Sequence, residues 1–302
     1  MEYPRVAILI LHYGQIEFTK KCIQSLLQND YKSYYILILD NSGLRQLDLL
    51  WFNKLQKTSI YYAKQNMGFA AGCNFLASKA LIKNFDYLLF LNNDTQVDSK
   101  LIIELVKIAN NQKDTGAVGC AISYLQNPQK IWFAGGYLDA KYCFTRHYLI
   151  NKSISSLKKL SKTRIIDWVT GCCMLISVQN WRKIGDFDTD YQSYFEDVDW
   201  CYRAKTKGLR NIIINQILLK HAVSASFGIE GSNNLTVNRA YYYARNPLLF
   251  IKKYLKGYKK NLALCGQTTF VLAYYVINML KTKNTRSIIS YLNGLYAGFK
   301  NK

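Results

Sequence analysis

Short apolar runs of strand length alternate with amphipathic stretches of helix length over the first hundred residues. The strand-like runs are residues 6–11, 35–39, 60–63 and 87–91. The stretches with helical periodicity between them are residues 19–28, 44–55 and 70–82. Strands that alternate with helices are typical of a doubly wound, mostly parallel sheet. The sequence therefore predicts an α/β fold.

Polar residues follow each of these apolar runs. They are residues 12–14, 40–43, 66–68 and 92–94, and two of the four sets contain a carboxylate. In a doubly wound sheet, ligands bind outside the carboxyl ends of the strands. We therefore expect a binding site at this edge of the sheet.

The second half of the chain has a different rhythm. After about residue 115 the helical alternation weakens, and Gly135-Gly136 with nearby aromatic residues predicts hairpins that lead to a strand at 166–177. Helices are expected at 196–207, which Gly208 would end, and at 239–254. Hairpins beside a parallel sheet indicate a mixed sheet.

The composition fits one large domain with an appendage. The chain has 302 residues, 50% of them hydrophobic and 14% aromatic, which is enough for a sizeable core. We expect a main domain at 1–258, with halves 1–115 and 116–258, and a helical tail at 259–302. A charged-then-apolar leader is not visible before the first apolar run, so we expect a cytoplasmic protein.

Eight cysteines are scattered along the chain without a Cys-x-x-Cys pair. A chain of this length does not need disulfides to hold its fold. We interpret the cysteines as reduced core residues and expect neither a zinc site nor a disulfide framework.

The formal net charge of +21 indicates an affinity for polyanions, such as phosphorylated substrates, anionic lipid or nucleic acid. Abundant Lys, Asn, Ile and Tyr also occur in proteins encoded by AT-rich genomes, which gives a purely compositional alternative. Basic residues are spread over the chain rather than interleaved with aromatics, and this pattern is not typical of a nucleic-acid-binding module. We therefore expect no nucleic acid partner.

The tail is rich in apolar residues between Leu262 and Leu280, and lysines flank it at 259–260, 281 and 283. This pattern favours an interfacial helix on anionic lipid over a spanning helix, because polar residues interrupt the apolar run. A helix packed in the core or against another subunit is the alternative.

Two carboxylates after strand-like runs are candidate ligand-binding groups. A nucleoside diphosphate leaving group needs a divalent cation, and such cations prefer carboxylate and phosphate oxygens, so Asp94 is a candidate metal ligand. Asp40 is suited to accept the imino hydrogen of uracil or thymine. A cap or an Asx turn is the alternative at both positions.

Three acids lie within four residues at the expected helix start, Glu196, Asp197 and Asp199, beside Trp200 and other aromatic residues. Complementarity to the positive end of the helix accounts for one or two acids. The aromatic setting suits sugar faces, and a carboxylate there is suited to take the proton from an acceptor hydroxyl. Because a helix N-terminus lowers a carboxyl pKa, burial or neighbouring acids must raise it for this role.

His221 follows a strand-like run at 212–219. A lone histidine is usually structural, but imidazole also binds divalent manganese. His221 is therefore a candidate third metal partner.

Together these stretches resemble family 2 glycosyltransferases with the GT-A fold, especially the rhamnosyltransferase-like and galactofuranosyltransferase-like branch that builds bacterial surface polysaccharides. Each stretch alone is a weak signal, and their order along the chain carries the resemblance. The matching stretches are residues 6–14, 40–43, 65–74, 91–95, 171–177, 184–188, 194–203, 221–224 and 245–246.

The resemblance implies an inverting transfer of a hexosyl or rhamnosyl group from a UDP- or dTDP-sugar to a glycan acceptor, which we expect to be lipid-linked. The tail adds the expectation that the enzyme is peripheral at the inner face of the plasma membrane. It implies that Asp197 is the catalytic base and that Asp94 and His221 hold Mg²⁺ or Mn²⁺. The nucleotide-binding half 1–115 would bind the donor through Tyr13, Asp40, Asn66, Gly68 and Asn93. The acceptor-binding half 116–258 would use Gly171, Glu196, Asp199 and Trp200.

One departure from the family pattern concerns the metal, because Asn92 occupies the first acidic position of the Asp-x-Asp motif. Fewer acidic ligands weaken metal affinity. The Gln-x-x-Arg-Trp signature of processive members is missing from the sequence, which favours addition of one or a few sugars. The alternative is a nucleotidyltransferase, which would share the sheet and the metal. Those enzymes have a Gly-rich, basic loop after the first strand, and residues 12–15 of this chain do not resemble it.

Overall fold

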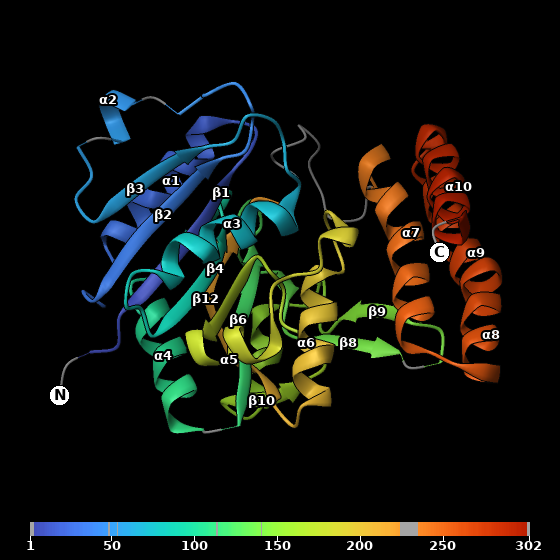
Figure 1. The fold of residues 1–302 in the computed structure, drawn as a ribbon. Helices are drawn as coiled ribbons and strands as arrows, with labels where there is room; N and C mark the ends of the chain where they lie inside the picture. The colour runs from blue at the N-terminus through green and yellow to red at the C-terminus, as the bar shows by residue number, and fades with distance from the viewer. Residues whose placement is uncertain are drawn as a thin grey trace.

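The computed structural model describes residues 3–47, 49–52, 54–112, 114–139, 141–223 and 235–300. One mixed sheet runs through the molecule in the order β10-β12-β6-β11-β4-β1-β2-β3, with β5 paired to β12 and β7 to β6 (Figure 1). Its strands are β1 (Val6–His12), β2 (Tyr34–Asp40), β3 (Thr58–Tyr62), β4 (Tyr87–Asn92), β5 (Thr95–Val97), β6 (Thr115–Tyr124), β7 (Ile131–Phe133), β10 (Thr163–Ile166), β11 (Cys173–Ser177) and β12 (Arg210–His221).

The N-terminal half confirms the expected parallel sheet. Strand β1 pairs in parallel with β2 and β4, so that His12 lies beside Asp40 and Leu11 beside Asn92. The strands are almost completely buried because helices cover both faces. The connecting helices are α1 (Ile16–Leu27), the short α2 (Leu49–Phe52) and α3 (Phe69–Leu81).

The expected strand at 166–177 is wrong as a single element. Strand β10 ends at Ile166, and β11 begins only at Cys173, with an irregular segment between them. The segment contains Gly171, whose N–H binds the side chain of Asp197. Residues 168–172 of the connection are buried like most of β11, so a mostly apolar sequence crosses the break and hides it.

Further helices flank the second half of the sheet. They are α4 (Leu101–Asn111), α5 (Val178–Ile184) and α6 (Glu196–Thr206), and only α6 was among the expected elements. Helix α4 buries Leu101, Ile102, Leu105 and Val106 against the sheet. A separate hairpin of β8 (Gly136–Asp139) and β9 (Phe144–His147) follows Gly135-Gly136, as expected.

The C-terminal helices form a block at one side of the sheet (Figure 1). They are α7 (Val237–Tyr254), α8 (Gly257–Gly266), a π-helical turn η4 (Gln267–Val271), α9 (Leu272–Lys281) and α10 (Thr285–Lys300). Helix α10 crosses α7 closely because Gly294 and Gly298 bring the two backbones together: a Cβ at Gly294 would lie 2.2 Å from the carbonyl oxygen of Tyr241. The helical extension expected at the C-terminus is confirmed.

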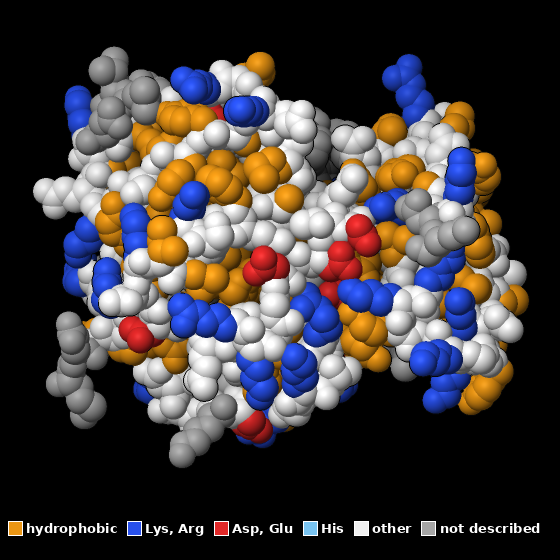
Figure 2. Space-filling model, in the orientation of Figure 1, with side chains coloured by type: hydrophobic (Ala, Val, Ile, Leu, Met, Phe, Trp, Pro, Cys, Tyr) orange, Lys and Arg blue, Asp and Glu red, His pale blue; other side chains and the backbone are white. Residues whose placement is uncertain are grey.

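The segment Gly257–Lys281 has the length and composition of a membrane-spanning helix, a property that core helices of soluble proteins also show. Hydrophobic and basic side chains alternate along the outer side of the helix block (Figure 2). The inner side is buried at Ala263, Gln267, Val271 and Met279. The eight cysteines have free thiols, and all except Cys265 are buried.

Candidate active site

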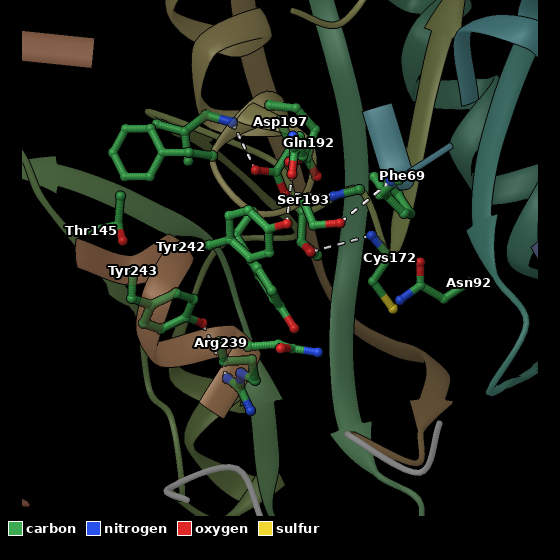
Figure 3. Close-up of a pocket in the computed structure, with 18 of the residues that line it drawn as sticks. Phe69, Asn92, Thr145, Cys172, Gln192, Ser193, Asp197, Arg239, Tyr242 and Tyr243 are labelled. Carbon is green, nitrogen blue, oxygen red and sulfur yellow. Dashed lines mark hydrogen bonds between the residues drawn. The ribbon is translucent and has the colours of Figure 1, made fainter. Parts of the chain in front are cut away.

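A cavity of about 760 Å³ opens where the carboxyl ends of β1 and β4 meet α6 and α7. Figure 3 shows residues from three directions around it: Asn92, Cys172 and Phe69 on one side, Gln192, Ser193 and Asp197 on the second, and Arg239, Tyr242 and Tyr243 on the third. The cavity also contains most of the predicted site residues, which are Tyr13, Asn66, Gly68, Asn93, Asp94, Gly171, Glu196, Asp197 and His221.

Asp197 lies in the first turn of α6 and lines the cavity. Its Oδ2 accepts a 2.8 Å hydrogen bond from the N–H of Gly171, and its Oδ1 accepts one of 2.8 Å from Val198. Burial raises the pKa of Asp197 to about 6, and these hydrogen bonds oppose the rise. Burial therefore outweighs the effect of the helix N-terminus, and the carboxyl group titrates near neutral pH.

Glu196 precedes Asp197 and is also buried in the cavity wall. Burial, reinforced by the charge of Asp197, raises the pKa of Glu196 well above its usual range. Its Oε2 has no hydrogen-bond partner among the residues that the structure describes. Of the two neighbours, Glu196 therefore has the stronger tendency to hold a proton.

The turn before α6 has an unusual backbone that α7 holds in place. Gln192, Tyr194 and Phe195 have φ values of 60°, 65° and 83°, in the left-handed region that side chains disfavour. The buried Asn246 of α7 donates from its Nδ2 to the carbonyl oxygens of residues 191, 193 and 194. Helix α7 therefore fixes the turn that aims Glu196 and Asp197 into the cavity.

Asp94 and His221 form a pair of candidate metal ligands. They are 127 positions apart in the sequence, but β5 and β12 pair so that His221 lies opposite Thr95. The Oδ1 of Asp94 lies 2.9 Å from Nε2 of His221. Both side chains are buried and line the cavity, and a carboxylate oxygen and an imidazole nitrogen directed at one point fit a divalent cation.

No third His, Cys, Asp or Glu completes a cluster with this pair in the described part of the chain. Asn92 lines the cavity and lies beside Cys172 (Figure 3), but it offers an amide. Asn93 turns its Nδ2 toward the protein and donates to Oγ1 of Thr19 at 2.9 Å. A cation held here would have two protein ligands and would take further oxygens from a bound diphosphate.

The predicted donor side divides into residues that face the cavity and one that does not. Asn66 receives a 3.0 Å hydrogen bond from Asn41 and one of 2.8 Å from the N–H of Gly68, so the three residues form a fixed turn. Gly68 has φ 78°, and a Cβ there would lie 3.1 Å from the carbonyl oxygen of Gln192. Tyr13 lies at the rim, where it is 37% exposed.

Asp40 is fully buried and is not among the residues that line the cavity. Its Oδ1 accepts from the N–H and the hydroxyl of Ser42, and its Oδ2 accepts from the N–H of Leu47. This is the Asx-turn alternative considered from the sequence. Asn41, its neighbour, faces the cavity in its place.

The structure corrects the expectation that Asp199 and Trp200 contact the acceptor, because neither side chain lines the cavity. Asp199 is fully buried and accepts hydrogen bonds from Tyr191, Tyr254 and Arg203. Trp200 packs in the core, stacked on Trp181 with 6.1 Å between ring centroids. Both residues hold α6 in the domain.

Several cavity residues escaped the sequence analysis. Trp132, His147 and Trp168 form an aromatic wall beside His221, with 4.5 Å between the ring centroids of Trp132 and His221. Burial lowers the pKa of His147 to about 4, so its ring is neutral at physiological pH. Arg239 of α7 lies over the rings of Tyr194 and Tyr243. These residues come from distant segments, and each alone resembles an ordinary core aromatic or surface arginine.

The family model described as Glycosyl transferase family 2 matches residues 7–185, which is more than half of the chain, so the chain belongs to this family. It is 23% identical over 215 residues to rhamnosyltransferase WbbL of Escherichia coli strain K12, covering 68% of this chain and 78% of WbbL. It is 26% identical over 231 residues to the O-antigen biosynthesis protein RfbC of Myxococcus xanthus, covering 74% of this chain but 18% of RfbC.

Solved structures show the same GT-A-like fold at low sequence identity. GalNAc-T7, crystallised with UDP, GalNAc and Mn²⁺, matches with a TM-score of 0.61 and 15% identity over 81% of this chain and 51% of its own. The mannosyltransferase PcManGT of Pyrobaculum calidifontis, in complex with GDP-Man and Mn²⁺, matches with a TM-score of 0.59 and 12% identity over 100% of this chain and 88% of its own. The chain is thus a family 2 glycosyltransferase.

Proposed function

We propose that this enzyme transfers a hexosyl or rhamnosyl group from a UDP- or dTDP-sugar, with inversion at the anomeric carbon, to a hydroxyl group of a lipid-linked glycan acceptor. The observation that carries the proposal is Asp197. It is a buried carboxylate whose pKa of about 6 matches a general base, and it lies in a cavity with a candidate metal pair.

In the proposed reaction the acceptor oxygen attacks the anomeric carbon from the face opposite to the diphosphate. The proton of that hydroxyl passes to Asp197, and the bond between the anomeric carbon and the diphosphate oxygen breaks. Attack from the opposite face inverts the anomeric configuration. Burial raises the pKa of Glu196, and in its protonated form this side chain is suited to donate a hydrogen bond to the acceptor.

Asp94 and His221 would hold Mg²⁺ or Mn²⁺. Such a cation would neutralise the negative charge that develops on the diphosphate. Two of the solved structures that share the fold, GalNAc-T7 and PcManGT, contain Mn²⁺. Tyr13, Asn66, Gly68 and Asn93 line the cavity and would bind the nucleotide. For Asp40 this role requires release of its bonds to Ser42 and Leu47.

The outer side of the C-terminal helices supports a location at the inner face of the plasma membrane. Basic residues border its exposed apolar side chains, and both features suit an anionic lipid surface (Figure 2). The apolar residues are Tyr258, Leu262, Phe270, Tyr274, Ile277, Leu280, Ile289, Leu292, Tyr296 and Phe299, and the basic ones are Lys256, Lys259, Lys281, Lys283, Arg286 and Lys300. We call this set the tail surface.

The proposal is tested by incubating the purified enzyme with a panel of UDP- and dTDP-sugars and MnCl₂ or MgCl₂, and by measuring nucleoside diphosphate release. Thermal unfolding with the same panel reports donor binding, because a ligand of the folded state stabilises it. We expect one donor class to raise the melting temperature and to release its nucleoside diphosphate. Absence of both effects across the panel would contradict the proposed function.

A further inference from the structure

The C-terminal helices contribute a wall of the cavity on their inner side. Gln267, Val271 and Tyr275 follow each other at intervals of four residues and all line the cavity. The first two are the ends of the π-helical turn that interrupts the helix between α8 and α9. Such turns are rare in proteins overall. Those that occur are often at functional sites, because the extra residue redirects side chains.

Gln267 is fully buried and joins the tail to the β8–β9 hairpin. Its Nε2 donates to the carbonyl oxygens of Tyr142 and Cys143, which fixes the orientation of the side-chain amide. Its Oε1 has no hydrogen-bond partner among the described residues. A buried oxygen of this kind is costly to leave unpaired, so a hydroxyl group that reached it would gain a hydrogen bond.

Aromatic rings continue this wall from the tail to the catalytic turn. The ring of Tyr275 lies 6.1 Å from Phe144 of the hairpin and 6.0 Å from Tyr243 of α7. Tyr243 lies 5.3 Å from Tyr194, which comes three residues before Asp197. The chain of contacts therefore runs from the π-helical turn to the residue expected to deprotonate the acceptor.

Part of this wall lies across the cavity from the carboxyl end of β4. Figure 3 shows Tyr242, Tyr243 and Thr145 across from Asn92 and Cys172. The wall combines flat aromatic faces with an amide oxygen and hydroxyl groups. A saccharide ring needs this combination, because its C–H face packs on aromatic rings and its hydroxyls require hydrogen-bond partners.

We propose that Gln267, Tyr275, Phe144 and Tyr243 form the subsite for a sugar ring of the acceptor, with Gln267 Oε1 accepting a hydrogen bond from one of its hydroxyls. The inference rests on the proposed function and adds to it, since the tail then selects the acceptor as well as contacting lipid. The π-helical turn joins the two roles, because its residues Gln267 and Phe270 lie on the inner and outer sides of one helix.

The test uses octyl β-glycosides of glucose, galactose, mannose and N-acetylglucosamine as probes in saturation-transfer NMR. The enzyme is first saturated with UDP or dTDP, whichever nucleotide it binds. We expect at least one glycoside to bind the wild type. Gln267→Leu and Tyr275→Leu should weaken that glycoside about tenfold, while nucleotide binding stays within about twofold. Tyr275→Phe keeps the ring and should retain glycoside binding.

The matched control is Thr269→Val, on the exposed side of the same π-helical turn. It should leave glycoside binding unchanged. If Gln267→Leu does not fold, Tyr275→Leu and Thr145→Val decide the question. A wild type that binds nucleotide but none of the glycosides, or variants that bind them as the wild type does, would overturn the subsite. A wild type that binds no UDP- or dTDP-sugar would instead overturn the proposed function.

Discussion

Asp197 makes the strongest prediction at the scale of single residues. Asp197→Asn keeps the shape of the side chain but cannot take the acceptor proton, so transfer should fall at least about 100-fold, the range assigned to positioned bases. Donor binding should stay within a few-fold, because the base acts on the acceptor. Initial rates and donor titrations measure the two effects.

The control for this substitution is Asp190→Asn, an exposed acid seven residues earlier that does not line the cavity. It should leave the rate unchanged. More than about a tenth of wild-type turnover in Asp197→Asn would exclude Asp197 as the base, since positioned bases contribute two to four decades. Glu196 would then be the next candidate.

The raised pKa of Asp197 predicts opposite effects of pH on activity and on stability. The base must be ionised, so kcat/KM should decline as pH falls below about 6. Stability changes in the other direction: the folded state favours the protonated form, so the contribution is present below the unfolded pKa and is lost as pH rises through about 6.

Asp197→Asn should therefore stabilise the folded protein at pH 7.5 while it removes activity. A shift of about two pKa units corresponds to about 3 kcal/mol, which sets the upper bound on the gain in unfolding free energy. Urea unfolding of wild type and variant at pH 7.5 and at pH 4.5 measures this gain, and it should shrink at the lower pH. If Asp197→Asn is less stable than the wild type at pH 7.5, burial does not destabilise the ionised form of this carboxylate.

Asp94 and His221 make a prediction about metal. Asp94→Ala and His221→Ala each remove one of two protein ligands, so the Mn²⁺ concentration for half-maximal rate should rise about tenfold or more. Rates at graded MnCl₂ concentrations measure it. Half-saturation that stays at the wild-type value in His221→Ala would return this histidine to a structural role.

Helical geometry explains which site residues the sequence predicted and which it did not. Asp94, Asp197 and His221 follow strands or begin a helix, where side chains meet at the ligand-binding edge. Asp199 lies two positions beyond Asp197, and on an α-helix residues two apart do not share a face. The cluster of acids in the sequence thus contains two acids of the site and one of the core.

At the scale of elements, α7 makes a prediction through Asn246. Asn246→Ala removes the side chain that holds the carbonyls of the turn at 191–194, whose backbone is in a disfavoured region. We expect kcat to fall about tenfold or more while donor KM changes little, because misplacing a catalytic group by a fraction of an ångström is costly. The pH profile should also lose its inflection near 6 if Asp197 moves into solvent.

The control is Val237→Ala, at the exposed start of the same helix, which does not line the cavity. It should leave kcat and the inflection in place. An unchanged kcat and pH profile in Asn246→Ala would show that the turn keeps its shape without α7.

Elements with a strong period were predictable, whereas those shaped by tertiary contacts were not. The four strands of the parallel half and helix α6 follow the sequence pattern closely. The break between β10 and β11 was missed because residues 168–172 of the connection are buried and mostly apolar, so they look like part of a strand. The π-helical turn of the tail also has no periodic signal in the sequence. Gln267 is distinguished from its neighbours only by a hydrogen bond to a backbone carbonyl of the hairpin segment, which is a tertiary contact.

At the scale of the whole molecule, the tail surface predicts binding to anionic membranes. Lys281→Glu with Lys283→Glu reverses two charges on it, and each basic residue near such a surface contributes about 1 kcal/mol, so sedimentation with vesicles of phosphatidylglycerol and phosphatidylcholine should fall at least about tenfold. Lys158→Glu with Lys159→Glu makes the same change in net charge on an exposed segment away from the tail and should have little effect. Equal losses in both variants would show that general charge, and not the tail surface, drives binding.

The order of strands in the sheet has a consequence for synthesis on the ribosome. Strand β4 is complete at Asn92, but its second neighbour, β11, begins only at Cys173. At about 5–20 residues per second, the growing chain exposes one side of β4 for several seconds. An unpaired apolar strand edge is a template for association with other chains. Nascent polypeptides of this enzyme should therefore depend on chaperones until β11 has emerged.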